Sequence, residues 1–128
     1  MRLLLDTHTF LWWLFGDARL SPKVRELLAD PDHAVFVSAA SAWEIATKVR
    51  IGRLPDAEEM ARDISGWIKR AGFLELPIQV RHAQQAGSWV QDHKDPFDRM
   101  LAAQSQIERL PLISTDPLIA TFGVKVIW

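Results

Sequence analysis

Carboxylates far apart in the sequence stand at positions from which they could share one site. The main candidates are Asp6, Glu44, Asp98 and Asp116, with Asp95 close to Asp98 as an auxiliary acid. Carboxylates that share a pocket repel one another, so without a counter-ion some must take up protons. A divalent cation removes that conflict, and oxygen ligands suit Mg²⁺ or Mn²⁺ better than Zn²⁺. Such a cation can polarise a phosphoryl oxygen and activate water, as phosphodiester hydrolysis requires.

Each of these acids also has an ordinary structural interpretation. Three of the aspartates stand at expected helix starts, where aspartate is favoured because it caps free backbone amides, and Asp98 lies in a first helical turn. Glu44 precedes Lys48 by one turn, as in a surface ion pair. However, it lies between Trp43 and Ile45 in a mostly apolar run, which is unusual for a fully solvated face. The residues alone therefore leave both a metal site and a set of helix caps open.

For the acids to meet, the fold must bring the ends of separate strands to one edge of a sheet. Short apolar runs typical of buried strands lie at residues 2–5, 34–37, 73–76, 112–114 and 124–127. Asp6 directly follows the first run, and Asp116 follows the fourth after only Thr115. Ligands bind beyond the carboxyl ends of strands in an open parallel sheet, so adjacent strands would bring Asp6 and Asp116 together.

Helical patterns separate these runs, and caps, prolines and glycines mark their ends. The expected helices span 7–15, 22–29, a segment capped by Ser38 or Ser41 that ends before Gly52, 57–71, 81–90 and 96–109, with a short turn or helix from Asp116-Pro117. Alternating strands and helices favour a parallel sheet covered on both faces. We predict a three-layer α/β/α fold with a central, mainly parallel sheet of about five strands, in one domain spanning residues 1–128.

Composition narrows the class of protein. No apolar stretch approaches the roughly 18 residues that span a bilayer, and the N-terminus lacks a secretory signal pattern, so we expect a cytoplasmic protein without a membrane partner. Cysteine is absent, which leaves oxygen or imidazole ligands for any metal. The net charge of -1 argues against bulk attraction to nucleic acid. If the acids hold a cation, however, the remaining surface is modestly basic and suits a phosphodiester substrate.

Several basic residues lie near the candidate acids. His8, His82 and His93 could be read as metal ligands or proton donors, but lone histidines are usually structural. The exception is His93-Lys94 directly before Asp95, where a cation could hold a phosphate. Arg99 is similarly placed, and its alternative role is a salt bridge to Asp95 or Asp98.

A second basic group follows Glu44. Lys48, Arg50 and Arg53 could contact an RNA backbone, or they could form a solvated helix end favoured by the helix dipole. The sequence does not choose between these roles.

Four motifs, in order and spacing over nearly the whole chain, resemble the PIN-domain family and in particular its VapC-type toxin branch. They are Leu3-Leu4-Leu5-Asp6-Thr7-His8, the stretch from Ser38 to Ile45 with Lys48 and Gly52 beyond, the stretch from Asp95 to Gln104, and Ser114-Thr115-Asp116. The first three are specific in combination, whereas the fourth is short. Ser114 stands where the family commonly has threonine.

The resemblance implies a sheet flanked by helices and a site that binds Mg²⁺ or Mn²⁺ for cleavage of single-stranded RNA. By position, the family's acidic sites correspond to Asp6, Glu44, Asp98 and Asp116, with Asp95 as the auxiliary acid. Many members pair with a small antitoxin and form homodimers. We also expect RNA contacts from Ser41, Lys48, Lys94, Arg99 and Ser114.

Two rival functions remain in view. A catalytically silent PIN-like module would keep the acidic pocket for metal binding or protein interaction, and RNA cleavage assays with Mn²⁺ and EDTA would separate it from a nuclease. A phosphatase or receiver-type phospho-acceptor is disfavoured, because such sites usually need a second acid beside Asp6, and Thr7-His8 offers none.

Overall fold

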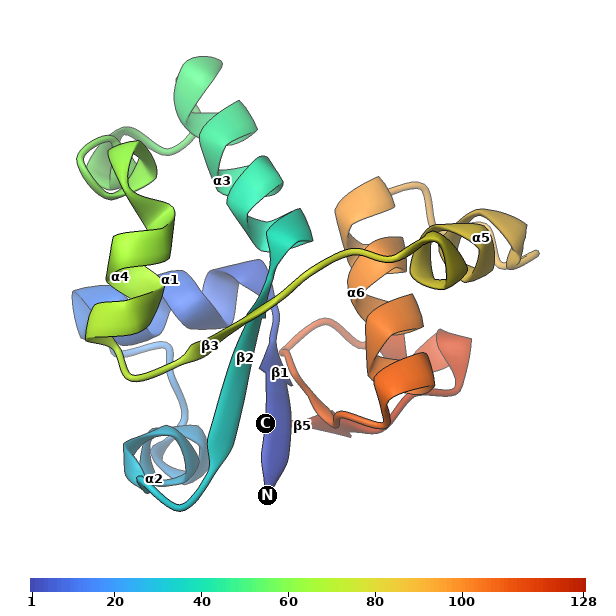
Figure 1. Cartoon of the computed structure of the whole chain (residues 1–128), viewed down its shortest axis with the longest axis horizontal. Coiled ribbons are helices and arrows are strands. Elements are labelled where there is room, and N and C mark those ends of the chain that lie inside the picture. Colours follow the sequence, from blue (N-terminus) through green and yellow to red (C-terminus); the bar gives the residue numbers. More distant parts are fainter.

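Five parallel strands form one sheet, and its order places the first strand at the centre. The computed structural model describes residues 1–128 and orders the sheet β3-β2-β1-β4-β5 (Figure 1). The strands are β1 (Arg2–Leu5), β2 (Ala34–Ser38), β3 (Leu74–Leu76), β4 (Leu112–Ile113) and β5 (Val126–Ile127). In the register, Leu5 pairs with Val37 on one side and with Ile113 on the other. The carboxyl ends of the three middle strands therefore meet at one edge.

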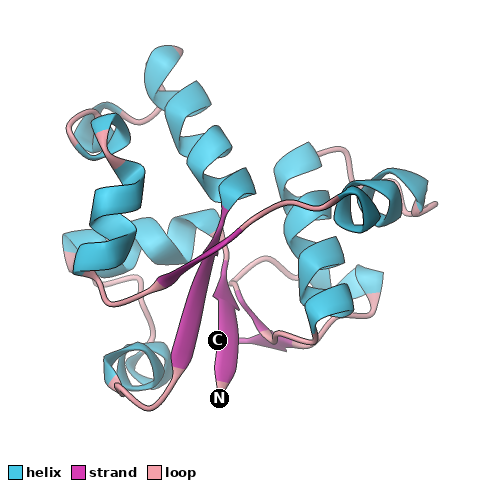
Figure 2. Ribbon diagram, viewed as in Figure 1, coloured by secondary structure: helices cyan, strands magenta, loops and turns pink.

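Helices cover both faces of this sheet, as the sequence predicted. They are α1 (Thr7–Phe15), α2 (Pro22–Ala29), α3 (Ala39–Arg50), α4 (Ile64–Arg70), α5 (Val80–Ser88) and α6 (Pro96–Glu108). Figure 2 shows α1, α2 and α4 on one side of the strands and α5 and α6 on the other, with α3 extending beyond the carboxyl end of β2. None of the helices has the length and apolar character needed to cross a membrane.

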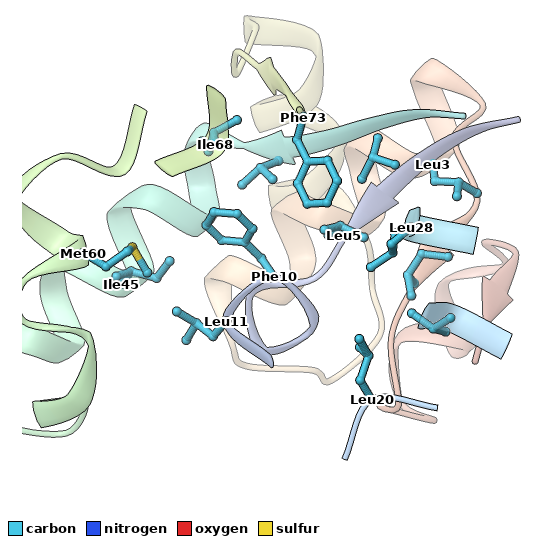
Figure 3. Close-up of a cluster of buried hydrophobic side chains, with 14 of the residues drawn as sticks. Leu3, Leu5, Phe10, Leu11, Leu20, Leu28, Ile45, Met60, Ile68 and Phe73 are labelled. Carbon is cyan, nitrogen blue, oxygen red and sulfur yellow. The ribbon is translucent and has the colours of Figure 1, made fainter. Parts of the chain in front are cut away.

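Side-chain alternation along β1 divides the core between the two faces. Leu3 and Leu5 lie on the face of the sheet that α1 and α2 cover and pack in one cluster with Phe10, Leu28 and Phe73 (Figure 3). Leu4 points the opposite way and packs against α6 in a second cluster. Successive side chains of a strand face opposite sides of the sheet. Fully burying one leucine contributes about 1.5–3 kcal/mol, so β1 is anchored from both sides.

Local capping signals in the sequence fix where the helices begin. The Ser21 hydroxyl accepts a hydrogen bond from the Val24 amide at 3.2 Å, and α2 starts there. Of the two serines that could cap α3, the structure uses Ser38, whose hydroxyl accepts from the Ala40 amide at 2.9 Å. A side-chain acceptor at the cap satisfies an amide that has no partner inside the helix.

The prediction of a single helix over residues 57–71 is wrong. This region contains two short 3₁₀ helices, η1 (Pro55–Ala57) and η2 (Met60–Arg62), followed by α4. Asp63 interrupts the run, because its carboxylate accepts a hydrogen bond from the Gly66 amide at 3.0 Å and caps α4. A capping residue has non-helical dihedrals, here φ -152°, so a helix cannot continue through it.

Candidate metal-binding active site

Asp6 lies at the end of β1 and caps α1. Its Oδ1 accepts a hydrogen bond from the Thr9 amide at 2.8 Å, while its own amide donates to the Ile113 carbonyl of β4 at 3.0 Å. The side chain of Thr9 also donates to the Ile113 carbonyl, at 3.1 Å. Asp6 is therefore held by both the central strand and its neighbour, with only 6 % of its surface exposed.

Burial determines the acidity of Asp6. Desolvation raises the pKa of this carboxyl above its ordinary value, and hydrogen bonds from Ser114 and Thr9 only partly oppose the shift. A buried carboxylate that pays a desolvation cost gains from a nearby cation more than an exposed one does. Capping alone therefore does not account for the environment of Asp6.

Asp98 lies in the first turn of α6, which Asp95 begins by accepting hydrogen bonds from the amides of Phe97 and Asp98. His93 Nε2 is 3.0 Å from Asp98 Oδ2. Burial raises the pKa of Asp98 to about 6; the hydrogen bond from His93 lowers this pKa, and the charges of Asp95 and Glu44 raise it. The negative charges of Asp95 and Glu44 thus act on Asp98.

One compact group of possible ligands forms at this edge. The ligand atoms of His93, Asp98 and Asp116 all lie within 4.8 Å of one another. Opposite ligands of an octahedral ion with bonds of about 2.1 Å are about 4.2 Å apart, so small side-chain movements would let all three reach one ion. The geometry and the donor types therefore fit a divalent cation. Asp6 and Glu44 lie outside this group.

Asp116 and Asp6 are linked through Ser114. The Asp116 amide donates to Ser114 Oγ at 3.0 Å, and Ser114 is also a hydrogen-bond partner of Asp6. Asp116 Oδ1 accepts from the Leu118 amide at 2.9 Å, which orders the turn after β4. The predicted adjacency of β1 and β4 is confirmed by their pairing.

Glu44 is buried despite its charge, with 3 % of its surface exposed. Its carboxylate forms an ion pair with Lys48 one turn later on α3. Burial of Glu44 and its i,i+4 pair with Lys48, which the sequence set against each other, thus occur together. Lys48 was expected to contact RNA, but its ammonium group is engaged with Glu44 in this structure.

Comparison with known proteins identifies the family. The model of the PIN-domain family matches residues 3–124. This chain belongs to the PIN-domain family. A curated relative, Ribonuclease VapC16 of Mycobacterium tuberculosis (strain ATCC 25618 / H37Rv), is 38 % identical over 64 residues, which cover 50 % of this chain and 44 % of that protein. The matched region thus spans less than half the length of this relative.

Solved structures share the fold of this PIN domain. VapBC2 from Rickettsia felis bound to a promoter DNA fragment contains a chain with a TM-score of 0.69 and 13 % identity, covering 99 % of this chain and 98 % of that one. A toxin-antitoxin complex from Klebsiella pneumoniae contains a chain with a TM-score of 0.66 and 20 % identity, covering 98 % and 96 %. At these identities the similarity shows the fold alone.

Two serines expected to contact RNA are instead used inside the PIN domain. Ser41 Oγ accepts a hydrogen bond from Thr7 Oγ1 at 3.0 Å, and Ser41 has no exposed surface. Ser114 is 1 % exposed and binds Asp116 and Asp6 as described above. The structure therefore corrects both expectations: these hydroxyls support the acids rather than face a substrate.

Arg99 does not form the salt bridge to Asp95 or Asp98 that was one of its two expected roles. Its guanidinium donates hydrogen bonds of 2.6–3.0 Å to backbone carbonyls of the segment before α6, namely those of Ala86, Trp89, Gln91 and His93. The guanidinium donors therefore bind the backbone in this structure, and none of them bonds Asp95 or Asp98. Lys94 is exposed directly before Asp95, and its expected contact with RNA stays a prediction.

His93 also has a contact that the sequence did not predict. The sequence suggested a phosphate contact, whereas the structure directs its ring at Asp98. The only available signal was its position just before the Asp95-Pro96 helix start. That signal does not indicate which way the ring points, since the ring packs against Phe122, which is distant in the sequence.

Proposed function

We propose that this PIN domain is a metal-dependent endoribonuclease that cleaves single-stranded RNA and acts as the VapC-type toxin of a toxin-antitoxin pair. The observation that supports this best is the convergence of Asp98 and Asp116 at the sheet edge where Asp6 also ends β1. Burial first, and then the charges of Asp95 and Glu44, raise the pKa of Asp98, so its ionised form is disfavoured there and stability alone does not explain an acid at this position. Membership of the PIN-domain family and the ribonuclease name of a relative agree with the proposal.

In this proposal the cation is Mg²⁺ or Mn²⁺, held by Asp98 and Asp116 with Asp6 and Glu44 beside them and Asp95 as an auxiliary acid. The bound ion would neutralise charge on the phosphate and lower the pKa of a bound water. Asp98, with a pKa of about 6, is mostly ionised at neutral pH and can therefore hold a cation there. Asp6 is fixed by the Thr9 amide and cannot rotate freely away from the site.

In this proposal, exposed basic groups on or next to the elements that carry the acids bind the RNA backbone. Lys94 is exposed next to Asp95, and Arg50 and Arg53 are exposed at the end of α3. Ammonium and guanidinium groups bind phosphate oxygens through charge-assisted hydrogen bonds. We assign these residues to the RNA backbone, in place of the buried serines and Arg99.

The proposed partners are a small antitoxin and a second copy of this chain. The solved structures that share this fold include VapBC and toxin-antitoxin complexes, which supports a partner of that type. Light scattering of the purified chain, alone and after co-expression with a candidate antitoxin, tests both associations. A protein that stays monomeric and binds no antitoxin would contradict this part of the proposal.

The decisive experiment measures cleavage of labelled single-stranded and duplex RNA with Mn²⁺, Mg²⁺ or EDTA. Asp98→Asn should lower the cleavage rate by at least about 100-fold, equivalent to about 3 kcal/mol in transition-state stabilisation. Asp32→Asn is the matched control, because Asp32 is exposed in the turn before β2, away from the carboxyl ends of the strands. Cleavage that persists in EDTA or in Asp98→Asn would contradict the proposal. Metal binding without cleavage would favour the silent module.

A further inference from the structure

We propose that His93 is a direct ligand of the divalent cation, so that the site binds through one imidazole nitrogen as well as carboxylate oxygens. The inference rests on the proposed function, because it concerns the same cation. It departs from the all-carboxylate site that the sequence motifs suggest. The inference concerns His93, Asp98 and Asp116, whose possible ligand atoms all lie within 4.8 Å of one another.

The position of the imidazole nitrogen matches a coordination position. His93 Nε2 lies 3.0 Å from Asp98 Oδ2. Neighbouring ligands of an octahedral ion with bonds of about 2.1 Å are about 3.0 Å apart, so the two atoms already have the separation of adjacent ligands. Asp116 completes a group in which every pair of ligand atoms lies within 4.8 Å.

Contacts on two sides hold His93 in this orientation. Its carbonyl accepts a hydrogen bond from Arg99 Nη1 at 3.0 Å, which fixes the backbone. The centroid of its ring lies 5.8 Å from that of the buried Phe122 in an edge-on arrangement, and only 14 % of the His93 side chain is exposed. A ligand restrained before the metal arrives loses little conformational entropy on binding. Arg99 thus acts as a positioning residue for this histidine.

Coordination requires a change of tautomer at His93. When Nε2 donates its hydrogen to Asp98, the lone pair lies on Nδ1; when Nε2 binds a cation, the hydrogen must lie on Nδ1. The proton leaves Nε2 to solvent and another enters at Nδ1, so the ring stays neutral and no net proton is released. Neutral imidazole is a common metal ligand through either nitrogen.

The simplest competing role is indirect. His93 could remain a hydrogen-bond donor that orients Asp98 without touching the ion. The two roles differ in one observable, which is whether a nitrogen atom is bound to the metal. They also differ in selectivity, because imidazole is a better ligand for transition-metal ions than for Mg²⁺.

Pulsed electron paramagnetic resonance of the full chain loaded with Mn²⁺ separates these roles. We expect a ¹⁴N coupling typical of directly bound imidazole, which changes to a ¹⁵N coupling in protein labelled with ¹⁵N-histidine. Bound Mn²⁺ without this coupling would overturn the inference while leaving the proposed nuclease site intact. Failure of the wild-type protein to bind Mn²⁺ would overturn both.

Two histidine variants assign the nitrogen. His93→Asn should abolish the coupling, whereas His8→Asn should retain it, since His8 is exposed beside Asp6 and outside the ligand group. Calorimetry should show that His93→Asn weakens Mn²⁺ binding by about tenfold or more and weakens Mg²⁺ binding less. Persistence of the coupling in His93→Asn, or an unchanged ratio of the two affinities, would contradict a role as ligand. Circular dichroism confirms that each variant is folded, and absence of the coupling from the wild-type spectrum overturns the inference without any variant.

Discussion

Thr7 Oγ1 donates a buried hydrogen bond to Ser41 Oγ at 3.0 Å, and this contact joins the two elements that carry Asp6 and Glu44. Thr7 directly follows Asp6 at the start of α1, and Ser41 lies one turn before Glu44 on α3. Both hydroxyls are buried, so each depends on the other for a partner. The bond therefore helps to fix the position of Asp6 relative to Glu44.

Replacing Ser41 by alanine should destabilise the protein. The substitution leaves the Thr7 hydroxyl buried without this acceptor, which costs about 1–3 kcal/mol. Urea denaturation measures the loss, and Ser65→Ala is the control, because the Ser65 hydroxyl bonds Glu75 at the exposed surface. Unchanged stability together with a loss of RNA binding would restore the substrate contact that the sequence suggested for Ser41.

Asp6→Asn should remove cleavage without weakening the fold. Burial raises the pKa of Asp6, which means that the ionised form is less favourable in the folded protein than in the unfolded chain. A neutral amide avoids that cost and still offers an oxygen to cap the Thr9 amide. We expect a melting temperature at neutral pH equal to or above that of the wild type, measured by differential scanning calorimetry.

Asp17→Asn is the control for Asp6→Asn, because the pKa of Asp17 is shifted in the opposite direction. Hydrogen bonds from Arg19 lower the pKa of Asp17 to about 2, so its ionised form is favoured in the folded state. Its amide variant should lose a small amount of stability at neutral pH and keep full cleavage activity. A marked loss of stability in Asp6→Asn but not in Asp17→Asn would show that the Asp6 charge is compensated within the protein.

Asp98 should give the metal-free protein a characteristic dependence on pH. Its folded-state pKa of about 6 lies above the ordinary value of 3.8, so the folded protein binds this proton more tightly than the unfolded chain. The resulting stabilisation is fully present below about pH 4 and is lost as the pH rises toward about 6. Urea denaturation across this range should show a fall in stability that is smaller in Asp98→Asn. Equal slopes for the two proteins would rule out the raised pKa.

Added Mn²⁺ should change this pH dependence. Protonation of Asp98 competes with the cation, so stabilisation by Mn²⁺ should decrease as the pH falls through about 6. Titrations followed by thermal unfolding at fixed pH measure this decrease.

Arg99→Lys should loosen the segment before α6. A lysine ammonium cannot reproduce the planar set of donors that reaches four carbonyls, and hydrogen bonds to charged groups contribute about 1.5–3 kcal/mol each. We expect a loss of about 3 kcal/mol in unfolding free energy and faster amide exchange over residues 86–95. Arg81→Lys is the control, because Arg81 is 57 % exposed and pairs with Glu108 at the surface, so its loss should stay within about 1 kcal/mol. Equal effects for the two variants would contradict the structural role of Arg99.

Local sequence signals predicted most of the elements because their physical causes lie within a few residues. The cap at Ser21, the proline at the start of α6 and the apolar run before Asp6 each act through adjacent backbone, and the structure has the corresponding boundaries. The same local reasoning failed over residues 57–71, where the carboxylate of Asp63 reaches the Gly66 amide and starts a new helix. Both a continuous helix and an internal cap satisfy the apolar pattern there.

The sequence by itself determined the alternation of strands and helices, the parallel sheet and the acids at its carboxyl edge, because apolar periodicity and strand ends are encoded residue by residue. Only the tertiary structure decided which side chains those acids meet. His93 points at Asp98 because Arg99 and Phe122 hold it, and Ser41 faces Thr7 because α3 packs beside α1. Such contacts depend on how the helices and strands pack against one another. They produce no periodic pattern in the sequence from which they could be predicted.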